Sequence, residues 1–401
     1  MGPHPIRCCS GFALALLLMA PPAVARNRVP LSPVTADAMA QAASQQAVAE
    51  YRRKLGEYQE ARVAFEQQAT AYWSSIAEKR RGRNAKRRER LAIEPDDYVL
   101  TQPPFYSGPK RPVNPEPSPP EPEPTRRERK YIPVIADLLK AAAEHFQFAP
   151  QRPASELEFK RAYARAAYAA GLTRDQAVRV YSFETGGNGS HDMQSGLSAS
   201  RAGSRAISSA IGYNQLLTTN SVELLAEQGH EIVQVLTERA GQLSGAPRKA
   251  IDQKIAVLKR MVAVARSVPD QWAEHEKVGD TPQGWALHAM VLDIDVGPLL
   301  QTHKLLTSLV FARAKGYTRA LTAAELEMMN LTGDSTGLDM VTMPQPLREQ
   351  VPTSNFFQRS GYERNPVAIR HNTVAKLLAV TDSRMDSNSL LTGAKELAGA
   401  F

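Results

Sequence analysis

The stretch PPFYSGPKRPVNPEPSPPEPEP, residues 103–124, limits the possible folds of this chain more than any other segment, because ten of its residues are proline. Proline fixes φ and lacks the backbone N–H, so this stretch can form neither a helix nor a central strand. It predicts an extended, semi-rigid spacer. We therefore expect a linker over residues 91–130, between an N-terminal arm at residues 26–90 and a C-terminal domain at residues 131–401.

The first 25 residues have the pattern of a secretory signal peptide. A basic residue, Arg7, precedes a short apolar run at residues 12–20, and the small residues 23–25 suit cleavage. We expect residues 1–25 to be removed and the mature protein to be periplasmic or secreted. No segment reaches the roughly 18–20 apolar residues of a membrane helix, so no transmembrane segment is expected. Both cysteines, Cys8 and Cys9, would be lost with the signal.

The arm is expected to be one long helix with a basic end. Apolar residues recur at three- and four-residue steps over residues 48–76, which is typical of an amphipathic helix. The run EKRRGRNAKRRER at residues 78–90 follows. Residues 47–90 then form either a coiled-coil or docking arm for an envelope protein, or a helix folded back on the main domain. The basic run is either a solvated helix end or an electrostatic tether to anionic wall polymer or lipid headgroups.

The formal charge of +8 also predicts attraction to polyanions. Nucleic acid is a common polyanionic partner of basic proteins, but export makes an envelope polymer the better candidate. We expect no nucleic acid partner.

The C-terminal domain is expected to be mainly α. Ser155 with Glu158, and Thr173 with Gln176, have the spacing of capping boxes that open helices. Long alternating strand patterns are missing from the sequence. Further helical patterns run over residues 221–240, 246–267, 297–315, 322–329 and 370–380.

Glu184 lies near the end of the helix opened by Thr173, in RVYSFETGGNG. It shares a helix face with Ala177, Val180 and Tyr181. A carboxyl among apolar side chains loses hydration of its charged form, so its pKa is expected to rise. A protonated carboxyl is the group that donates a proton when a glycosidic bond breaks.

FETGGNG, followed by AIGYNQLL at residues 210–217, resembles the soluble lytic transglycosylase family, which is related in fold to goose-type lysozyme. The resemblance implies a lysozyme-like domain, dominated by helices, that binds peptidoglycan strands. It implies that Glu184 is the single catalytic acid and later the base. The sugar-binding residues that it implies are Thr185, Gly212, Tyr213, Asn214, Gln215 and Asn330.

The third motif of the family, Ala-Tyr-Asn, matches less closely. ELEMMNLT at residues 325–332 has Asn330 at the asparagine position and Met329 at the tyrosine position. Tyr362 and Asn365 are alternatives for this motif, and Tyr213 is a further candidate for the phenol. Residues 188–205 resemble an insertion between the first two motifs.

The family chemistry would close a 1,6-anhydro ring on N-acetylmuramic acid after cleavage of its bond to N-acetylglucosamine. An alternative is hydrolysis with Asp192 as the base that activates water. A second alternative is a catalytically silent wall-binding or scaffolding protein. The histidines lack the spacing of a metal site, and neither a metal nor a cofactor is expected.

Overall fold

The computed structural model describes residues 45–115, 130–197 and 203–401. The chain divides into two units, one made of residues up to 93 with 101–129, and the other of residues 94–100 and 130–401. The predicted signal peptide lies outside the described residues. Within the segment predicted as a linker, residues 94–100 belong to the second unit.

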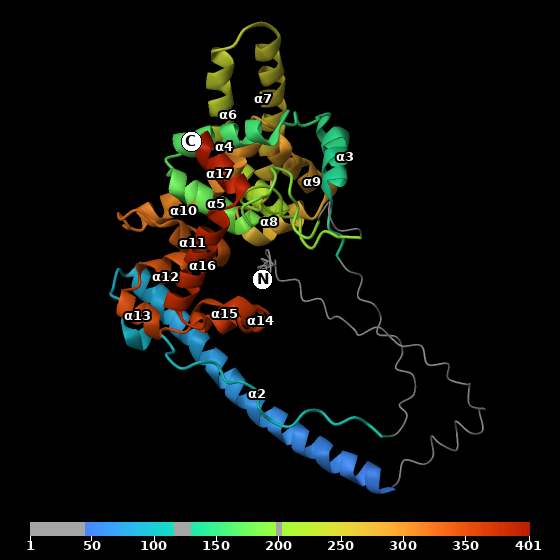
Figure 1. Ribbon diagram of the computed structural model, residues 1–401, viewed down its shortest axis with the longest axis vertical. Coiled ribbons are helices and arrows are strands. Elements are labelled where there is room, and N and C mark those ends of the chain that lie inside the picture. The colour runs from blue at the N-terminus through green and yellow to red at the C-terminus, as the bar shows by residue number, and fades with distance from the viewer. Residues whose placement is uncertain (1–44, 116–129, 198–202) are drawn as a thin grey trace, which may run out of the picture. The chain divides into compact units, whose positions relative to one another are not determined.

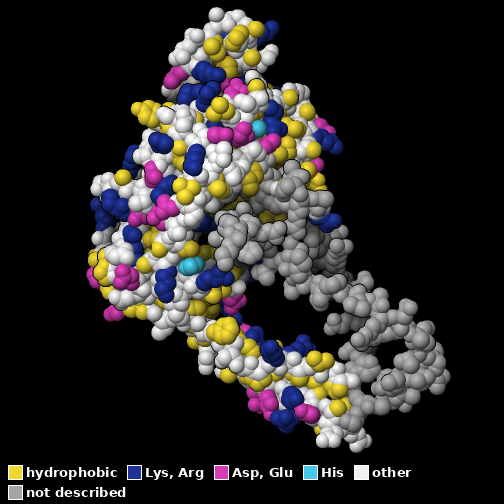
Figure 2. Space-filling view, in the orientation of Figure 1, with side chains coloured by type: hydrophobic (Ala, Val, Ile, Leu, Met, Phe, Trp, Pro, Cys, Tyr) yellow, Lys and Arg dark blue, Asp and Glu magenta, His cyan; other side chains and the backbone are white. Residues whose placement is uncertain are grey.

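The described part of the first unit consists of α2 (Gln45–Arg88) and the proline-rich segment after it. The helix predicted over residues 48–76 is present and continues into the basic run as far as Arg88. It is free of proline and carries ion pairs one turn apart, such as Arg53 with Glu57, which favour a helix. Figure 2 shows charged side chains of both signs and hydrophobic side chains interleaved along it.

The proline-rich segment packs on α2 through one aromatic residue. The ring of Tyr106 contacts those of Phe65 and Tyr58 edge-on, with centroids 5.4 and 6.3 Å away, and Arg62 lies over it. Residues 103–115 contain no helix or strand, as predicted. The remainder of the predicted spacer, residues 116–124, lies outside the described residues.

The second unit is mainly helical, which confirms the predicted class (Figure 1). In its described residues, β structure is limited to isolated bridges such as Ile211 with Leu216. Its α-helices are α3 (Ile135–Phe146), α4 (Glu156–Ala169), α5 (Arg174–Thr185), α6 (Thr218–Gly241), α7 (Gly245–Ala265), α8 (Trp272–Gly279), α9 (Pro282–His288), α10 (Gly297–Ala314), α11 (Ala323–Thr332), α12 (Asp334–Thr342), α13 (Gln345–Gln350), α14 (Arg359–Glu363), α15 (Pro366–Arg370), α16 (Val374–Ser389) and α17 (Thr392–Ala400). Short 3-10 helices are η1 (Pro95–Asp97), η2 (Ala289–Leu292) and η3 (Thr353–Phe356).

Most helix starts follow the predicted signals, with two corrections. Thr173 and Gln176 form the complete capping box. At α4, Ser155 caps the helix, but Glu158 accepts from the Ala154 N–H instead of that of Ser155, so the box is incomplete. The helix predicted over residues 370–380 begins at Val374, because the Thr373 hydroxyl caps it there.

Two hydrophobic cores stabilise the second unit, and α10 contributes to both. The first core joins α3, α6, α7 and α9, and the second joins α4, α5, α11, α16 and α17. Leu300 of α10 packs in the first, whereas Leu305 and Leu309 pack in the second. Helices α6 and α7, which both contribute to the first core, extend together as an antiparallel pair (Figure 1).

Helix α5 ends where its chain passes α16 and α17. Gly186 and Gly187 have φ values of 67° and 79°, in the left-handed region that favours glycine. A Cβ on Gly187 would lie 2.2 Å from the carbonyl oxygen of Asn388, and the Gly187 carbonyl accepts from the N–H of Ala394. The space beside the Gly187 backbone is therefore filled by the C-terminal helices of the protein itself.

Replacing each of these glycines separates the effect of backbone conformation from that of close packing. Gly186→Ala meets no atom within 4 Å, so we expect only the left-handed penalty of about 1 kcal/mol. Gly187→Ala adds a clash with the backbone, and we expect a loss of about 2–4 kcal/mol. Urea unfolding of both variants measures the difference; equal losses would contradict this packing.

Candidate active site

Glu184 lies on the wall of a groove of about 730 Å³. It is half-buried, at the C-terminal end of α5, and α6, α10 and α11 supply most of the other walls. Its lining residues are Glu184, Gln215, Leu217, Asn220, Glu223, Leu224, Glu227, Trp272, Lys304, Thr307, Ser308, Phe311, Met329, Asn330, Leu331, Gly333 and Asp334.

The structure brings Asn330 to Glu184, although the two residues are far apart in the sequence. The Asn330 Nδ2 donates to Glu184 Oε1 at 3.0 Å. Asn330 was the candidate for the third motif. Met329, at the position where the family has tyrosine, is fully buried and also lines the groove.

A second carboxyl, which the motifs did not indicate, faces the same amide. Glu327 is fully buried on α11, and both of its carboxyl oxygens lie 3.4 Å from Asn330 Nδ2. Glu327 also makes a side-chain hydrogen bond with Glu184. The two glutamates and the amide therefore form one polar cluster at the edge of the second core.

Burial raises the pKa of Glu184, which agrees with the direction expected from the sequence. The charge of Lys304 and the hydrogen bonds from Glu327 and Asn330 oppose this rise. The pKa of Glu327 is raised further, by burial and by the charge of Glu184. The pair therefore holds protons to a higher pH than two exposed carboxyls would.

Residues 211–216 form a tight turn held by one side chain of α10. The Gln301 amide accepts from the Asn214 N–H at 2.8 Å and donates to the Ile211 carbonyl at 3.1 Å. Gly212 has φ 84°, and a Cβ there would lie 2.0 Å from Gln301 Nε2. Lys304 donates to the Asn214 carbonyl at 3.2 Å, so the same turn orients the cation of the groove.

Of the residues predicted to bind sugar, only Gln215 and Asn330 line the groove. Tyr213 is fully buried among aromatic rings, and its hydroxyl donates to Glu156. Asn214 is fully buried against Gln301, and the backbone of Gly212 is buried beside it. Thr185 is buried, and its hydroxyl donates to the Tyr181 carbonyl at 2.7 Å. These four residues are therefore buried in the structure around the groove and do not face it.

The other candidates from the sequence do not line the groove. Asp192 pairs with Arg152 at 2.5 Å and accepts from the Ser190 hydroxyl. Burial opposes these contacts, but together with the charge of His191 they lower the pKa of Asp192. Tyr362 is buried on α14, and the Asn365 side chain caps α15.

The groove contains three further acidic groups, Glu223, Glu227 and Asp334, which the motifs did not indicate, and one exposed aromatic ring, that of Trp272. Burial and the carboxylate of Glu227 raise the pKa of Glu223 to about 7, and burial also raises that of Asp334. Trp272 is 47% exposed on the groove wall. A groove with an exposed aromatic ring and protonated carboxyls can bind a sugar face and donate protons.

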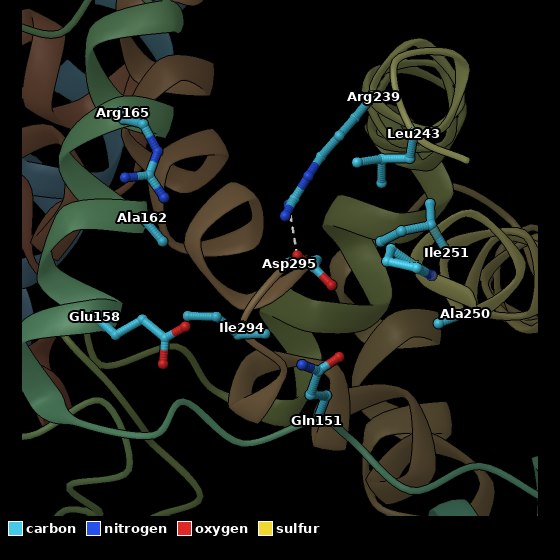
Figure 3. A pocket seen from close by; sticks show the side chains of 11 residues that line it. Gln151, Glu158, Ala162, Arg165, Arg239, Leu243, Ala250, Ile251, Ile294 and Asp295 are labelled. Carbon is cyan, nitrogen blue, oxygen red and sulfur yellow. Dashed lines mark hydrogen bonds and ion pairs between the residues drawn. The ribbon is translucent and has the colours of Figure 1, made fainter. Parts of the chain in front are cut away.

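A second cavity, of about 390 Å³, lies between α4 and the α6–α7 pair (Figure 3). Arg239 reaches into it and pairs with Asp295 at 2.5 Å. Lys254 pairs with Asp295 and with Asp293, at 2.8 Å from the latter. These charges neutralise one another, so the cavity has a structural ion network beside it that ties α6 and α7 to the start of α10.

Two further observations bear on the kind of site. Among the described residues, no group of three or more His, Cys, Asp or Glu side chains could hold a metal ion. None of the described helices has both the length and the apolar character needed to cross a bilayer.

No family model, curated protein or solved structure gives a significant match to this chain. The resemblance to lytic transglycosylases therefore depends on the motifs themselves and on where the structure places them.

We expect Glu223 to titrate near pH 7. Its raised pKa means that its contribution to stability is complete below about pH 4.3, the ordinary value, and is lost as the pH rises through about 7. Carboxyl carbon NMR shifts would report the midpoint. Glu227→Gln removes a like charge and should lower that midpoint, whereas Glu238→Gln, farther along α6, should not. A midpoint near 4 in the unmodified protein would contradict the buried environment.

Proposed function

We propose that this protein is a peptidoglycan lytic transglycosylase and that Glu184 is its catalytic acid and base. The observation that carries the proposal is the position of Glu184. It is a half-buried carboxyl with a raised pKa, opens onto a groove and accepts a hydrogen bond from Asn330. The motifs FETGGNG and GYNQ support the assignment, because the first contains Glu184 and the second supplies Gln215 to the same groove.

In the proposed reaction, protonated Glu184 donates to the oxygen that joins N-acetylmuramic acid to N-acetylglucosamine. The bond from that oxygen to the muramic C1 breaks, and positive charge develops at C1. The Glu184 carboxylate then removes the proton from the muramic C6 hydroxyl, whose oxygen bonds to C1. The 1,6-anhydro product forms without water, and Glu184 regains its proton.

The groove residues have separate roles in this reaction. Lys304 favours the Glu184 carboxylate after proton donation, because its charge acts on that carboxyl. Asn330 orients the same carboxyl, and Gln215 is available to contact an N-acetyl sugar. Trp272 offers a ring on which a sugar can stack.

The remaining parts of the proposal concern location and fold. The signal pattern at residues 1–25 supports export to the periplasm or beyond, where peptidoglycan is found. The fold of the C-terminal unit is proposed to be lysozyme-like, on the motifs and its helical class. The long helix α2 and its basic end support a contact with an envelope partner through residues 47–90.

A second candidate function is wall binding without catalysis. Met329 favours it, because none of the groove-lining residues supplies the phenol that the family places near its acid. A hydrolase is a variant of the enzymatic proposal. Asp192, the water-activating base expected from the sequence, does not line the groove, so a carboxyl that does, such as Glu223, would take that role.

Product analysis tests the proposal. Purified protein incubated with peptidoglycan sacculi should release anhydro-muropeptides, detectable by mass spectrometry. Glu184→Gln keeps the size of the side chain and removes its proton, so release should fall at least about 100-fold.

Binding to sacculi, measured by co-sedimentation, is the control for folding of the Glu184→Gln variant. Muropeptides with reducing ends would identify a hydrolase. Binding without any product from the unmodified protein would favour the non-catalytic alternative.

Trp272 is expected to contribute to glycan affinity. Trp272→Ala removes the exposed ring from the groove, and we expect affinity for soluble glycan fragments to fall about 5- to 30-fold. Tyr168→Ala is the matched control, because Tyr168 is 80% exposed but does not line the groove. Isothermal titration calorimetry measures both; equal effects would contradict a sugar site at Trp272.

A further inference from the structure

Glu327 is a buried ionisable group that the proposed reaction does not use. It is fully buried, one helical turn before Asn330, and so shares a face of α11 with it. Burying a carboxylate is costly unless hydrogen bonds or a cation compensate it. Its partners therefore decide whether it is charged.

The partners of Glu327 are too few for a buried carboxylate. Its hydrogen bonds involve one amide group, Asn330 Nδ2, at the long distance of 3.4 Å, and the carboxyl of Glu184. Two carboxyls share a hydrogen bond only when one of them is protonated. At least one proton therefore belongs to the pair.

The surroundings decide which carboxyl keeps that proton. Glu184 is half-buried, opens onto the groove and has the closer contact with the Asn330 amide, at 3.0 Å. Glu327 has no exposed surface. The charged form is therefore favoured at Glu184 and disfavoured at Glu327.

Few other charges act on the pair. Lys304 of α10 is the cation that acts on both carboxyls. Several other charged groups on the helices packed around Glu327 have partners elsewhere: Glu325 pairs with Arg319 and Arg348, Asp334 accepts from Ser308, Asp339 accepts from Tyr98, Asp382 and Asp386 pair with Arg179, Arg384 lies over Phe183, Lys376 donates to Asn372, and Lys315 lies over Phe311. Arg174 and Asp175 of α5 and Arg313 of α10 are also charged, but their charges are not among those that act on the pair.

We propose that Glu327 is a positioning residue that stays protonated in the folded protein and donates a hydrogen bond to Glu184. The inference that this orients the catalytic acid rests on the proposed function; the protonation itself does not. During the reaction, Glu184 loses its proton to the glycosidic oxygen and regains one from the C6 hydroxyl. Glu327 keeps its own proton throughout and, with Asn330, stabilises the transient Glu184 carboxylate.

Two substitutions at Glu327 separate the effect of its hydrogen-bond donor from the effect of its charge. In Glu327→Gln, the amide still donates, so kcat should stay within about threefold of the unmodified protein and the pH profile should not move. In Glu327→Leu, the donor is lost. The kcat should then fall about 10- to 100-fold with little change in KM, and the alkaline limb of the profile should move to higher pH. Glu238→Gln, exposed and outside the groove, is the control for charge alone.

An ionised Glu327 would give a different result. If Glu327 were ionised, its charge would hold the pKa of Glu184 up, and Glu327→Gln would move the alkaline limb to lower pH by a unit or more. That result would overturn the proposal, as would an activity of Glu327→Leu equal to that of the unmodified protein. Should the leucine variant not fold, the glutamine variant still decides between the two states.

The pH dependence of thermal stability tests the protonation of Glu327 without any measurement of enzymatic activity. It therefore separates this inference from the proposed function. Because the folded pKa of Glu327 is raised, its contribution to stability is complete below about pH 4.3 and is lost as the pH rises through the folded pKa. The Tm of Glu327→Gln should therefore fall less between pH 5 and 9 than that of the unmodified protein. Glu184→Gln should change this slope less. Equal slopes for the unmodified protein and Glu327→Gln would overturn the protonated state, whether or not the protein cleaves peptidoglycan.

Discussion

The contact between α5 and α11 is the interaction on which the candidate site depends. Helix α5 ends at Thr185, and its last turn presents Glu184 to α11, where Asn330 donates to it and Glu327 lies behind it. These are polar groups at the edge of a hydrophobic core, and their stability depends on their being paired with one another. Moving either helix would leave a buried carboxyl without a partner. The packing of α5 against α11 therefore also fixes the position of the Glu184 carboxyl.

Helix α10 connects this contact to the rest of the unit. Gln301 holds the turn at residues 211–216, and Lys304, one turn later, faces the groove and binds the carbonyl of Asn214. The leucines of α10 pack in both cores. One helix thus sets the position of the turn, the cation and the groove wall relative to Glu184. The proposed catalytic groups belong to rigid elements, as a precisely placed acid requires.

Local signals in the sequence were sufficient to predict most of the helices and the raised pKa of Glu184. The capping box of Thr173 and Gln176 involves neighbours in the chain, so its spacing alone predicts where α5 begins. Asn330 came from a motif resemblance, and the structure places it on Glu184. Tyr213 shows the limit of that approach. A motif gives a position in the chain but not the direction of a side chain, and here the ring points into the core.

The parts of the site that could not be predicted depend on contacts between distant segments. Nothing near Glu327 in the sequence indicates that it meets Glu184. The carboxyl of Glu223 joins the groove through the packing of α6 against α10, and that of Asp334, at the start of α12, joins it through a hydrogen bond from Ser308 of α10. Trp272 has no local feature that separates an exposed tryptophan from a buried one. The described part of the proline-rich segment, residues 103–115, is irregular as predicted, but its contact with α2 through Tyr106 needs the tertiary structure.

A crystal structure of the Glu184→Gln variant with a bound peptidoglycan fragment of four or more sugars would test whether Glu184 is the catalytic acid. We expect the fragment to lie along the groove, with one glycosidic oxygen within hydrogen-bonding distance of the residue 184 side chain and a sugar ring against Trp272. A fragment bound outside this groove, or bound within it with every glycosidic oxygen beyond the reach of residue 184, would contradict Glu184 as the catalytic acid.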